Sequence, residues 1–450
     1  MFIPTPNLPI APAHPSIPSY WAASARQPEP PCPPLTGEQS CEVAVIGGGY
    51  TGLSAALHLA RDHGVEARIL EAAVPGWGAS GRNGGFCCMG AAKLSYPGMI
   101  RRHGLDDTRR YLASQQAAVA LVRDTIQREG LQVQTVGEGE ITLAHRPNRV
   151  AMLADEQRFL AERLGLDSTL LDREALVARG MAGPAFHAGL HNPVGFGLHP
   201  LDYARGLAMA ADHHGARLHG RSPVIHWARE GNRHRLHTPH GCLLAHRVIV
   251  ACNGYFPESL HPRLHGRVLS ALSNILVTRP LTGAEREAQG WTSRQMAFDS
   301  RDLLHYFRLL PDNRFLFGGR GGISASAGAQ RRMRRYLLKA FHRLFPAWQA
   351  VAVEYFWNGY VALARDLVPH VGRAPDDTTV LHALAYHGNG VAMASWSGRA
   401  VAGLVVGNPD VERALPALVR RPPPRFPLPG LRNMYLRAAY LGFWLHDEWL

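Results

Sequence analysis

The stretch VIGGGYTG at residues 45–52 follows an apolar run and precedes a segment with helical periodicity. Gly47, Gly49 and Gly52 form a GxGxxG pattern at the turn between them. The first glycine permits the tight turn, the second lets a pyrophosphate approach the backbone, and the third lets the helix pack closely on the strand. Glu71 ends the next apolar run, where a carboxylate can accept hydrogen bonds from ribose hydroxyls. The stretch therefore predicts a strand–turn–helix–strand unit that binds a dinucleotide.

A second glycine-rich stretch, GWGASGRNGG, spans residues 76–85, just beyond the acid expected to bind ribose. A nicotinamide-binding protein has no need of such a stretch at this position. Toward the C-terminus, YHGNGV at 386–391 again lies between an apolar strand pattern and a helix pattern. Glycine this dense lets the backbone lie against a ligand that tolerates no side chain. These turns thus indicate places where a cofactor approaches the backbone.

Both stretches resemble the D-amino-acid oxidase (DAO) family, which includes sarcosine and glycine oxidases, and most closely the subgroup of gamma-glutamylputrescine oxidases. The first of these stretches resembles the flavin loop of that family, so the resemblance implies FAD as the cofactor. The likeness covers nearly the whole chain. It further rests on SYWAASA at 19–25, HPLDYARGLA at 199–208, VTRPL at 277–281, YFRLLPDNRFLFGG at 306–319 and HGNGVAMASWSGRAVA at 387–402.

The resemblance implies an α/β fold in which a discontinuous, Rossmann-like FAD-binding domain is interrupted twice by a substrate domain. The substrate domain is expected to have an antiparallel sheet with flanking helices. Residues 1–40 contain 11 prolines and predict an extended arm rather than a folded domain. Residues 411–450 predict a helical tail that packs back on the protein. The expected boundaries are 41–97, 190–265 and 350–410 for the FAD-binding domain, and 98–189 and 266–349 for the substrate domain.

The resemblance also implies which residues hold FAD. Ser80, Arg82 and Asn83 should lie in the loop toward the isoalloxazine, and the backbone of Val224 should meet the adenine. The last helix pattern should direct its positive end at the pyrimidine edge of the flavin, where it stabilises negative charge. The expected FAD-binding residues are Gly47, Gly49, Tyr50, Thr51, Gly52, Glu71, Ser80, Arg82, Asn83, Gly84, Val224, Asn253, Gly359, Gly388, Asn389, Gly390 and Val391.

The activity that the resemblance implies is FAD-dependent oxidation of a primary or secondary amine, such as a gamma-glutamylputrescine-like amine or an N-alkyl amino acid. A hydride moves from the carbon beside the nitrogen to flavin N5, the imine hydrolyses to a carbonyl compound, and O2 as acceptor gives H2O2. Three alternatives stay open: a D-amino-acid or sarcosine-type dehydrogenase that reduces a quinone, a flavin-binding protein without turnover, and a flavin hydroxylase that binds NADPH.

Amine oxidation by a flavin needs positioning and a neutral amine more than a dedicated acid or base, so we expect no catalytic triad. Residues 305–308 alternate along one expected strand, so His305 and Phe307 face one way and Tyr306 and Arg308 the other. We expect the substrate-binding residues to come from His305, Tyr306, Trp357, Asn358 and Tyr386, although each type is more often a buried aromatic or a core residue than a ligand.

Lysine is rare in this chain, since only Lys93 and Lys339 stand among its 48 lysines and arginines. Lys93 lies eight residues past the second glycine-rich stretch. A compact ammonium can approach a flavin through one water, or lose its proton when buried, whereas a guanidinium cannot. In sarcosine-type relatives a lysine from elsewhere in the chain promotes the reaction with O2. Lys93 is therefore the catalytic candidate, for oxygen activation or substrate binding, and the alternative is an exposed lysine with no role.

Two departures from the family pattern affect the surroundings of the flavin. FCC follows Gly85 where a polar residue such as Gln often stands, and Asn389 replaces the histidine that usually precedes the second glycine. Cys87 and Cys88 suggest a thioether to the flavin. In sarcosine oxidases, however, the linking cysteine lies near the region that here reads HYFRL and contains no cysteine. We therefore expect noncovalent FAD and small, packed thiols.

Composition indicates which partners other than FAD and the amine substrate are expected. The formal charge of +13 is spread along the chain and not concentrated on one element, which argues against a nucleic-acid partner but leaves an attraction for acidic small molecules. The six cysteines form no CxxC pair and the 24 histidines no zinc spacing, so we expect reduced thiols and no metal.

No window approaches the roughly 18 apolar residues of a membrane span. No lysine or arginine precedes Arg26, so we expect a cytoplasmic enzyme.

Overall fold

The computed structural model describes residues 19–448, and one of its two large sheets contains the strand that leads into the first glycine-rich turn. In this eight-stranded sheet, β1 (Gly37–Ile46) lies between β12 (Gly241–Val250) and β2 (Ala67–Leu70) and is parallel to both. The last four residues of β1 are buried, as expected for a parallel strand that is covered on both faces. The other strands are β9 (Arg217–His219), β10 (His226–Glu230), β11 (Arg233–His237), β18 (His370–Ala374) and β19 (Asp377–Leu384).

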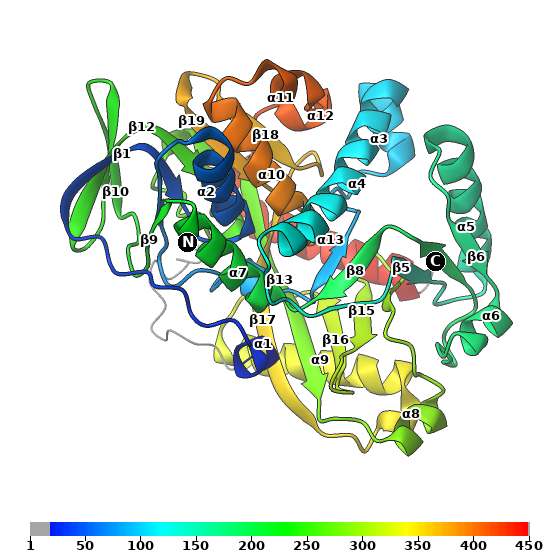
Figure 1. Cartoon of the computed structure of the whole chain (residues 1–450). Coiled ribbons are helices and arrows are strands. Elements are labelled where there is room, and N and C mark those ends of the chain that lie inside the picture. The colour runs from blue at the N-terminus through cyan, green and yellow to red at the C-terminus, as the bar shows by residue number, and fades with distance from the viewer. Residues whose placement is uncertain (1–18, 449–450) are drawn as a thin grey trace.

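Helices α2 (Tyr50–His63), α7 (Pro200–His213) and α10 (Gly390–Val405) cover one face of this first sheet (Figure 1). Val43 and Val45 of β1 pack in the same apolar cluster as these helices, while the alternate residues of β1 face a separate cluster on the opposite side. The period-two alternation of a strand explains this division. The sheet therefore holds the starts of α2 and α10 on one side.

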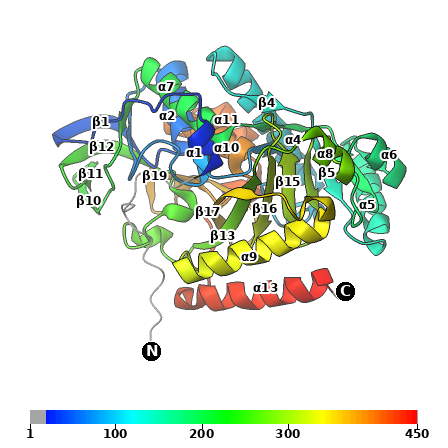
Figure 2. The ribbon, with the colours of Figure 1, turned by 90° about the horizontal axis from the view of Figure 1, so that it is seen from below.

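The second large sheet also has eight strands, and α9 (Ala327–Leu344) covers one of its faces (Figure 2). Within it, β13 (Val268–Thr278) lies between β17 (Val353–Ala364) and β16 (Phe315–Arg320). Phe341 of α9 packs in an aromatic cluster with side chains of the sheet. The other strands are β15 (His305–Leu309), β14 (Met296–Asp299), β5 (Glu140–Leu143), β7 (Gly189–Asn192) and β6 (Thr169–Leu171), and a small third sheet consists of β3 (Phe86–Cys88), β8 (Gly195–Leu198) and β4 (Thr135–Val136).

The expected α/β class is confirmed, and the strand pairing differs from the expectation in three details. Residues 353–364, expected with the FAD-binding region, pair with β13 of the second sheet. Residues 189–192 likewise belong to the second sheet, although the expected boundary falls at 190. The second sheet is not wholly antiparallel, because β14 and β5 are parallel. Sheet membership is decided by backbone pairing between distant segments, which a local pattern does not show. The division into two domains remains a prediction.

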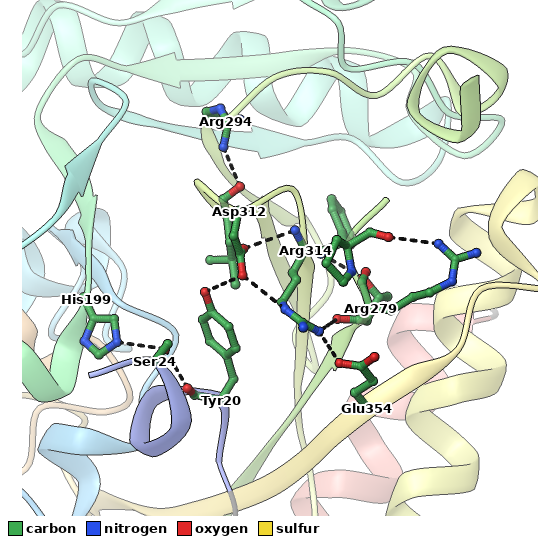
Figure 3. Close-up of polar contacts among 12 residues, drawn as sticks. Tyr20, Ser24, His199, Arg279, Arg294, Asp312, Arg314 and Glu354 are labelled. Carbon is green, nitrogen blue, oxygen red and sulfur yellow. Dashed lines mark hydrogen bonds and ion pairs between the residues drawn. The ribbon is translucent and has the colours of Figure 1, made fainter. Parts of the chain in front are cut away.

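The proline-rich N-terminal segment is anchored to the second sheet where the structure describes it. Residues 1–18 lie outside the described part, and α1 (Tyr20–Ser24) follows them. The Tyr20 hydroxyl donates to Asp312 Oδ2 at 2.9 Å, and Ser24 Oγ lies 3.1 Å from His199 Nε2 (Figure 3). The Trp21 indole donates to the Asn83 carbonyl at 2.8 Å. The segment thus reaches the second glycine-rich loop.

The expected C-terminal helix is present as α13 (Arg432–Glu448), drawn in red in Figure 2. Arg432 forms an ion pair with Glu258 at one end, and at the other the Asp447 carboxylate accepts hydrogen bonds from the amides of Asp302 and Leu303. No helix within residues 19–448 has the length and apolar character needed to cross a membrane. The remaining α-helices are α3 (Tyr96–His103), α4 (Leu105–Arg128), α5 (Asn148–Phe159), α6 (Arg173–Ala178), α8 (Gly283–Gln289), α11 (Pro409–Ala414) and α12 (Ala417–Arg420).

Candidate functional site

A cavity of about 840 Å³ is lined by residues from both large sheets. Ile46 and Leu70 line it at the ends of β1 and β2, and Ser273 and Tyr306 line it from the second sheet. In parallel α/β sheets, ligands bind at the carboxyl ends of the strands. The cavity therefore lies where a dinucleotide is expected, and it continues to the face of the second sheet opposite α9.

The first glycine-rich turn has the geometry that a dinucleotide requires. Gly47 has φ +111°, and a Cβ there would lie 3.0 Å from the Ala251 carbonyl. A Cβ on Gly52 would lie 2.0 Å from the Gly47 oxygen, so only glycine lets α2 start this close to the turn. Gly49 lines the cavity together with Tyr50 at the start of α2. The N–H groups at this helix start favour an anion.

Glu71 lines the cavity and also holds the turn. Its Oε2 accepts a hydrogen bond from the Gly48 amide at 2.7 Å, and its Oε1 accepts one from the Ala73 amide at 2.9 Å. Burial raises the pKa of Glu71, and the two amides oppose that shift. Val224 lines the cavity near its loop neighbour Pro223. These positions agree with the expected ribose and adenine end of the site.

The second glycine-rich loop lines the cavity through Ser80, Arg82, Asn83 and Gly84. Ser80 Oγ accepts a hydrogen bond from the Tyr50 amide at 2.9 Å, which ties this loop to the start of α2. The Asn83 amide donates to the Ser80 carbonyl at 2.8 Å and holds the loop's own shape. The Arg82 guanidinium lies 4.1 Å from the centre of the Trp77 ring, and burial lowers its pKa. The loop is therefore rigidly shaped.

Arg308 of β15 holds this loop from the second sheet. Its side chain is 2% exposed, and it donates to the Gly84 carbonyl at 3.1 Å and to the Leu198 carbonyl at 2.7 Å. Gly85 has φ +73°, and a Cβ there would lie 2.3 Å from the guanidinium. As expected, Tyr306 and Arg308 face the same side of the strand. Arg308 therefore positions the second glycine-rich loop, a role that the sequence did not predict.

The last helix also starts at the cavity. Gly388, Asn389, Gly390 and Val391 all line it, and α10 begins at Gly390. The Asn389 side chain donates to the Met89 carbonyl at 3.0 Å, so this departure from the family pattern connects α10 with the segment after the second loop. Two helix starts, those of α2 and α10, thus border one cavity. Thr51, Asn253 and Gly359, also expected at the cofactor, line it as well.

Three of the expected substrate residues, His305, Trp357 and Asn358, do not line the cavity. His305 is 1% exposed, its Nδ1 lies 2.9 Å from Asp299 Oδ2, and its ring stacks on Phe317 on the α9 side of the sheet. Trp357 is buried, and its indole donates to the Arg82 carbonyl at 2.8 Å. Both side chains support the structure and lie behind the cavity wall. The expectation for these three residues is corrected, because none of them lines the cavity, and strand alternation turns His305 away from it.

Tyr306 and Tyr386 do line the cavity, and so does Lys93. The Tyr306 hydroxyl lies 2.9 Å from Ser273 Oγ. Lys93 is half-buried, and the cost of burying its charge, together with the nearby cationic Arg320, lowers its pKa to about 7. An exposed surface position for Lys93, the alternative considered from the sequence, is thereby excluded.

Glu140, at the start of β5, is a site residue that the sequence reasoning missed. It lines the cavity with Thr142, while Ile141 and Leu143 point into the aromatic core, so strand alternation was the available signal. Burial raises the pKa of Glu140 to about 7. The Cys88 thiol, which also lines the cavity, hydrogen-bonds its carboxyl group.

The side of α13 that faces the cavity forms another part of the cavity wall. The sequence analysis did not predict this contribution. Its lining residues recur at intervals of three and four positions, the period of one helix face, and this spacing was readable in the sequence. They are Tyr435, Leu436, Ala439, Tyr440 and Phe443.

The residues at the first end of the cavity fit FAD. Gly47 and Gly52 accept no side chain, two helix starts offer N–H groups to a pyrophosphate and a flavin ring, and Glu71 lies where ribose is expected. The second loop and the face bearing Tyr306 leave room beyond this cradle for a further small molecule.

Comparison with known proteins agrees with this geometry. The family described as FAD dependent oxidoreductase (DAO) matches residues 42–404. Gamma-glutamylputrescine oxidoreductase of Escherichia coli K12 is 31% identical over 431 residues, which cover 94% of this chain and 96% of that protein. The crystal structure of glycine oxidase from Geobacillus kaustophilus matches with a TM-score of 0.67 at 22% identity, covering 82% of this chain and 95% of that one. L-proline dehydrogenase from P. horikoshii matches with a TM-score of 0.67 at 18% identity, covering 90% and 99%. The chain therefore belongs to the DAO family of FAD-dependent oxidoreductases.

Proposed function

We propose that this enzyme oxidises a primary or secondary amine that also carries a carboxylate, such as a gamma-glutamylputrescine-like amine or an N-alkyl amino acid. The observation that carries the proposal is the far wall of the cavity, which combines Glu140, Lys93 and Arg320 beyond the FAD cradle. Groups of both charges suit a substrate that has both an amine and a carboxylate. The E. coli relative is named for such an amine, gamma-glutamylputrescine.

Bound FAD supplies a hydride acceptor for the carbon beside the amine nitrogen. The chain's own contribution is to hold that carbon in place and to keep water away. Tyr306 of β15 and Phe443 of α13 both line the cavity and provide apolar ring surface for the substrate's carbon chain. The start of α10 at Gly390 provides a positive helix end where negative charge develops. The resulting imine is hydrolysed to a carbonyl compound.

We further propose that FAD is held without a covalent bond. Cys87 is fully buried and does not line the cavity, and burial raises the pKa of its thiol. Cys88 lines the cavity, but burial and the Glu140 carboxyl raise its pKa well above the ordinary value. A thiol that stays protonated is a poor nucleophile toward a flavin ring. Acid precipitation should release all the yellow colour into the supernatant, and colour retained in the pellet would contradict noncovalent binding.

The electron acceptor is proposed to be O2, with H2O2 as coproduct. Lys93 supports this choice, since a lysine at the cavity wall can provide positive charge for oxygen activation or bind the substrate carboxylate. A quinone acceptor would leave the oxidation of the amine unchanged. Only the second half of the catalytic cycle, in which the reduced flavin is reoxidised, would differ.

Anaerobic mixing of the yellow holoenzyme with a panel of amines tests the function directly. The panel contains gamma-glutamylputrescine, putrescine, sarcosine, N-methylalanine and D-alanine, with succinate as the control that lacks an amine. Bleaching of the flavin absorbance by one of the amines, followed by peroxide formation when air is admitted, is the expected result. Bleaching without peroxide would favour the dehydrogenase, and no bleaching by any amine would overturn the proposed function.

A further inference from the structure

We propose that Lys93 is a nucleophile that captures the imine or carbonyl product as a Schiff base, with Glu140 carrying the proton in that step. This inference deepens the proposed function and rests on it, because the amine oxidation supplies the imine. It is carried by the placement of the two side chains, which line the same cavity beyond the FAD cradle.

The surroundings of Lys93 keep its amine free to react. Its side chain forms no hydrogen bond or ion pair within the described part of the chain, where only electrostatic and burial effects act on it. Its backbone amide is held by the Leu367 carbonyl at 2.8 Å, so the loop that carries it is fixed. Burial, and a neighbouring cation, are the two conditions that make a lysine nucleophilic near neutral pH. The cation here is Arg320.

Glu140 is suited to carry a proton. Its Oε2 is buried without a hydrogen-bond partner among the described residues, so the carboxyl group has an unsatisfied position. Its pKa of about 7 matches that of Lys93, and the Lys93 charge favours its ionised form. The other titratable groups that act on the pair are Cys88, Glu156 and Arg320. Matched pKa values let protons move either way at neutral pH.

The step balances without a further reagent. The Lys93 Nζ lone pair adds to the imine carbon, and the two Nζ protons pass one after the other through Glu140 to the substrate nitrogen. The bond from carbon to that nitrogen then breaks, ammonia or an amine leaves, and the product stays linked to Nζ as an imine. Water adds to this linkage, the carbonyl product departs, and Lys93 returns to its free amine. No group is oxidised or reduced in the exchange.

Borohydride trapping tests the proposal without turnover. The holoenzyme is mixed with butanal at pH 7, treated with sodium cyanoborohydride, digested and mapped by mass spectrometry. The chain contains only Lys93 and Lys339, so the exposed Lys339 and the N-terminal amine serve as internal controls. We expect Lys93 to be labelled roughly tenfold or more faster than Lys339, because an exposed lysine is almost wholly protonated at this pH. Equal labelling of the two lysines, or none at Lys93, would overturn the proposal.

Two matched variants test the role of Glu140. In Glu140→Gln, which keeps the shape, labelling of Lys93 should slow by about tenfold or more through loss of the proton carrier. Glu162→Gln removes an exposed carboxylate that does not line this cavity and should label at the wild-type rate. Equal rates in the wild type and Glu140→Gln would remove Glu140 from the step. FAD absorbance confirms that each variant is folded. If Lys93 is trapped by butanal while no amine bleaches the flavin, the proposed function fails and the nucleophile stands.

Discussion

The Tyr386 hydroxyl lies 2.8 Å from Thr51 Oγ1, so one buried hydrogen bond joins the loop that leads into α10 to the first turn of α2. Both residues line the FAD cradle. The two helix starts that border the cavity are therefore connected by side chains from positions 335 residues apart.

Tyr386→Phe removes this hydrogen bond while it keeps the ring. Loss of one buried neutral hydrogen bond should weaken FAD binding by about 1 kcal/mol, or roughly fivefold in Kd. Quenching of FAD fluorescence on reconstitution of the apoprotein measures the change. Tyr203→Phe is the control, since Tyr203 is bonded to Ser395 Oγ at 3.0 Å and does not line the cavity. If Tyr203→Phe lost as much FAD affinity as Tyr386→Phe, the Tyr386–Thr51 hydrogen bond would have no specific role in FAD binding.

Gly390→Leu should weaken FAD binding far more than it weakens the fold. A Cβ at Gly390 would lie 3.3 Å from Tyr386 Cβ, and a longer side chain would enter the cavity at the start of α10. Gly403→Leu in the same helix meets Val411 at 2.7 Å, away from the cavity, and should lower stability with FAD affinity retained. Thermal unfolding of the apoproteins and FAD titration separate the two effects. Equal losses of stability and affinity in Gly390→Leu would make Gly390 merely structural.

Arg308→Met should destabilise the protein by about 3 kcal/mol, because two buried carbonyls lose a charged donor. The carbonyls of Gly84 and Leu198 belong to the second loop and to β8, so FAD binding should weaken as well. Urea unfolding followed by fluorescence measures the stability. Arg334→Met on the exposed side of α9 should change it by less than about 0.5 kcal/mol. Similar values for the two variants would show that the Arg308 contacts contribute little.

The protein should lose stability as the pH falls below about 6.5. Burial lowers the pKa of His382 to about 3, and neither of its ring nitrogens has a hydrogen-bond partner among the described residues. A histidine whose pKa is lowered in the folded state is protonated first in the unfolded chain. The unfolded state is therefore stabilised relative to the folded state as the pH drops from about 6.5 toward 3. At pH 5 this costs about 2 kcal/mol for His382 alone.

His382→Leu removes the imidazole that the unfolded chain would protonate. Its free energy of unfolding should therefore fall by about 2 kcal/mol less than that of the wild type between pH 7 and 5. Urea unfolding at the two pH values gives the difference. His240→Leu, at an exposed position, should follow the wild type at both. If His382→Leu lost as much stability as the wild type over this range, His382 would not be a source of the acid sensitivity.

Lys93→Met keeps the side-chain length and removes the amine. If Lys93 serves oxygen activation or substrate binding, stopped-flow should show reoxidation by O2 slowed by roughly tenfold or more, or a comparable loss of amine affinity. Lys339→Met, on the exposed side of α9, is the matched control. Wild-type values for both reoxidation and affinity in Lys93→Met would show that the amine has neither role.

The first glycine-rich turn and its place at the cavity were predictable because they depend on local sequence. Gly47, Gly52 and Glu71 lie in one strand–turn–helix–strand unit, so glycine spacing and apolar periodicity were enough to predict where they lie. The start of the last helix was predictable for the same reason. Which strand residues of the second sheet meet the cavity was not predictable in this way. Alternation separates the two faces of a strand but does not say which face meets the cavity, so Glu140 lines it and His305 does not.

The sequence by itself determined the α/β class, the dinucleotide turn and the positions at which glycine is required, since these depend on spacing within short segments. Only the tertiary structure decided that β17 joins the second sheet, that Arg308 holds the loop at Gly84, and that Lys93 and Glu140 share one cavity. Lys93 and Glu140 come from a loop and a strand 47 residues apart in the chain. Their proximity arises from backbone pairing between distant strands and from burial, and neither is encoded in the spacing of nearby residues.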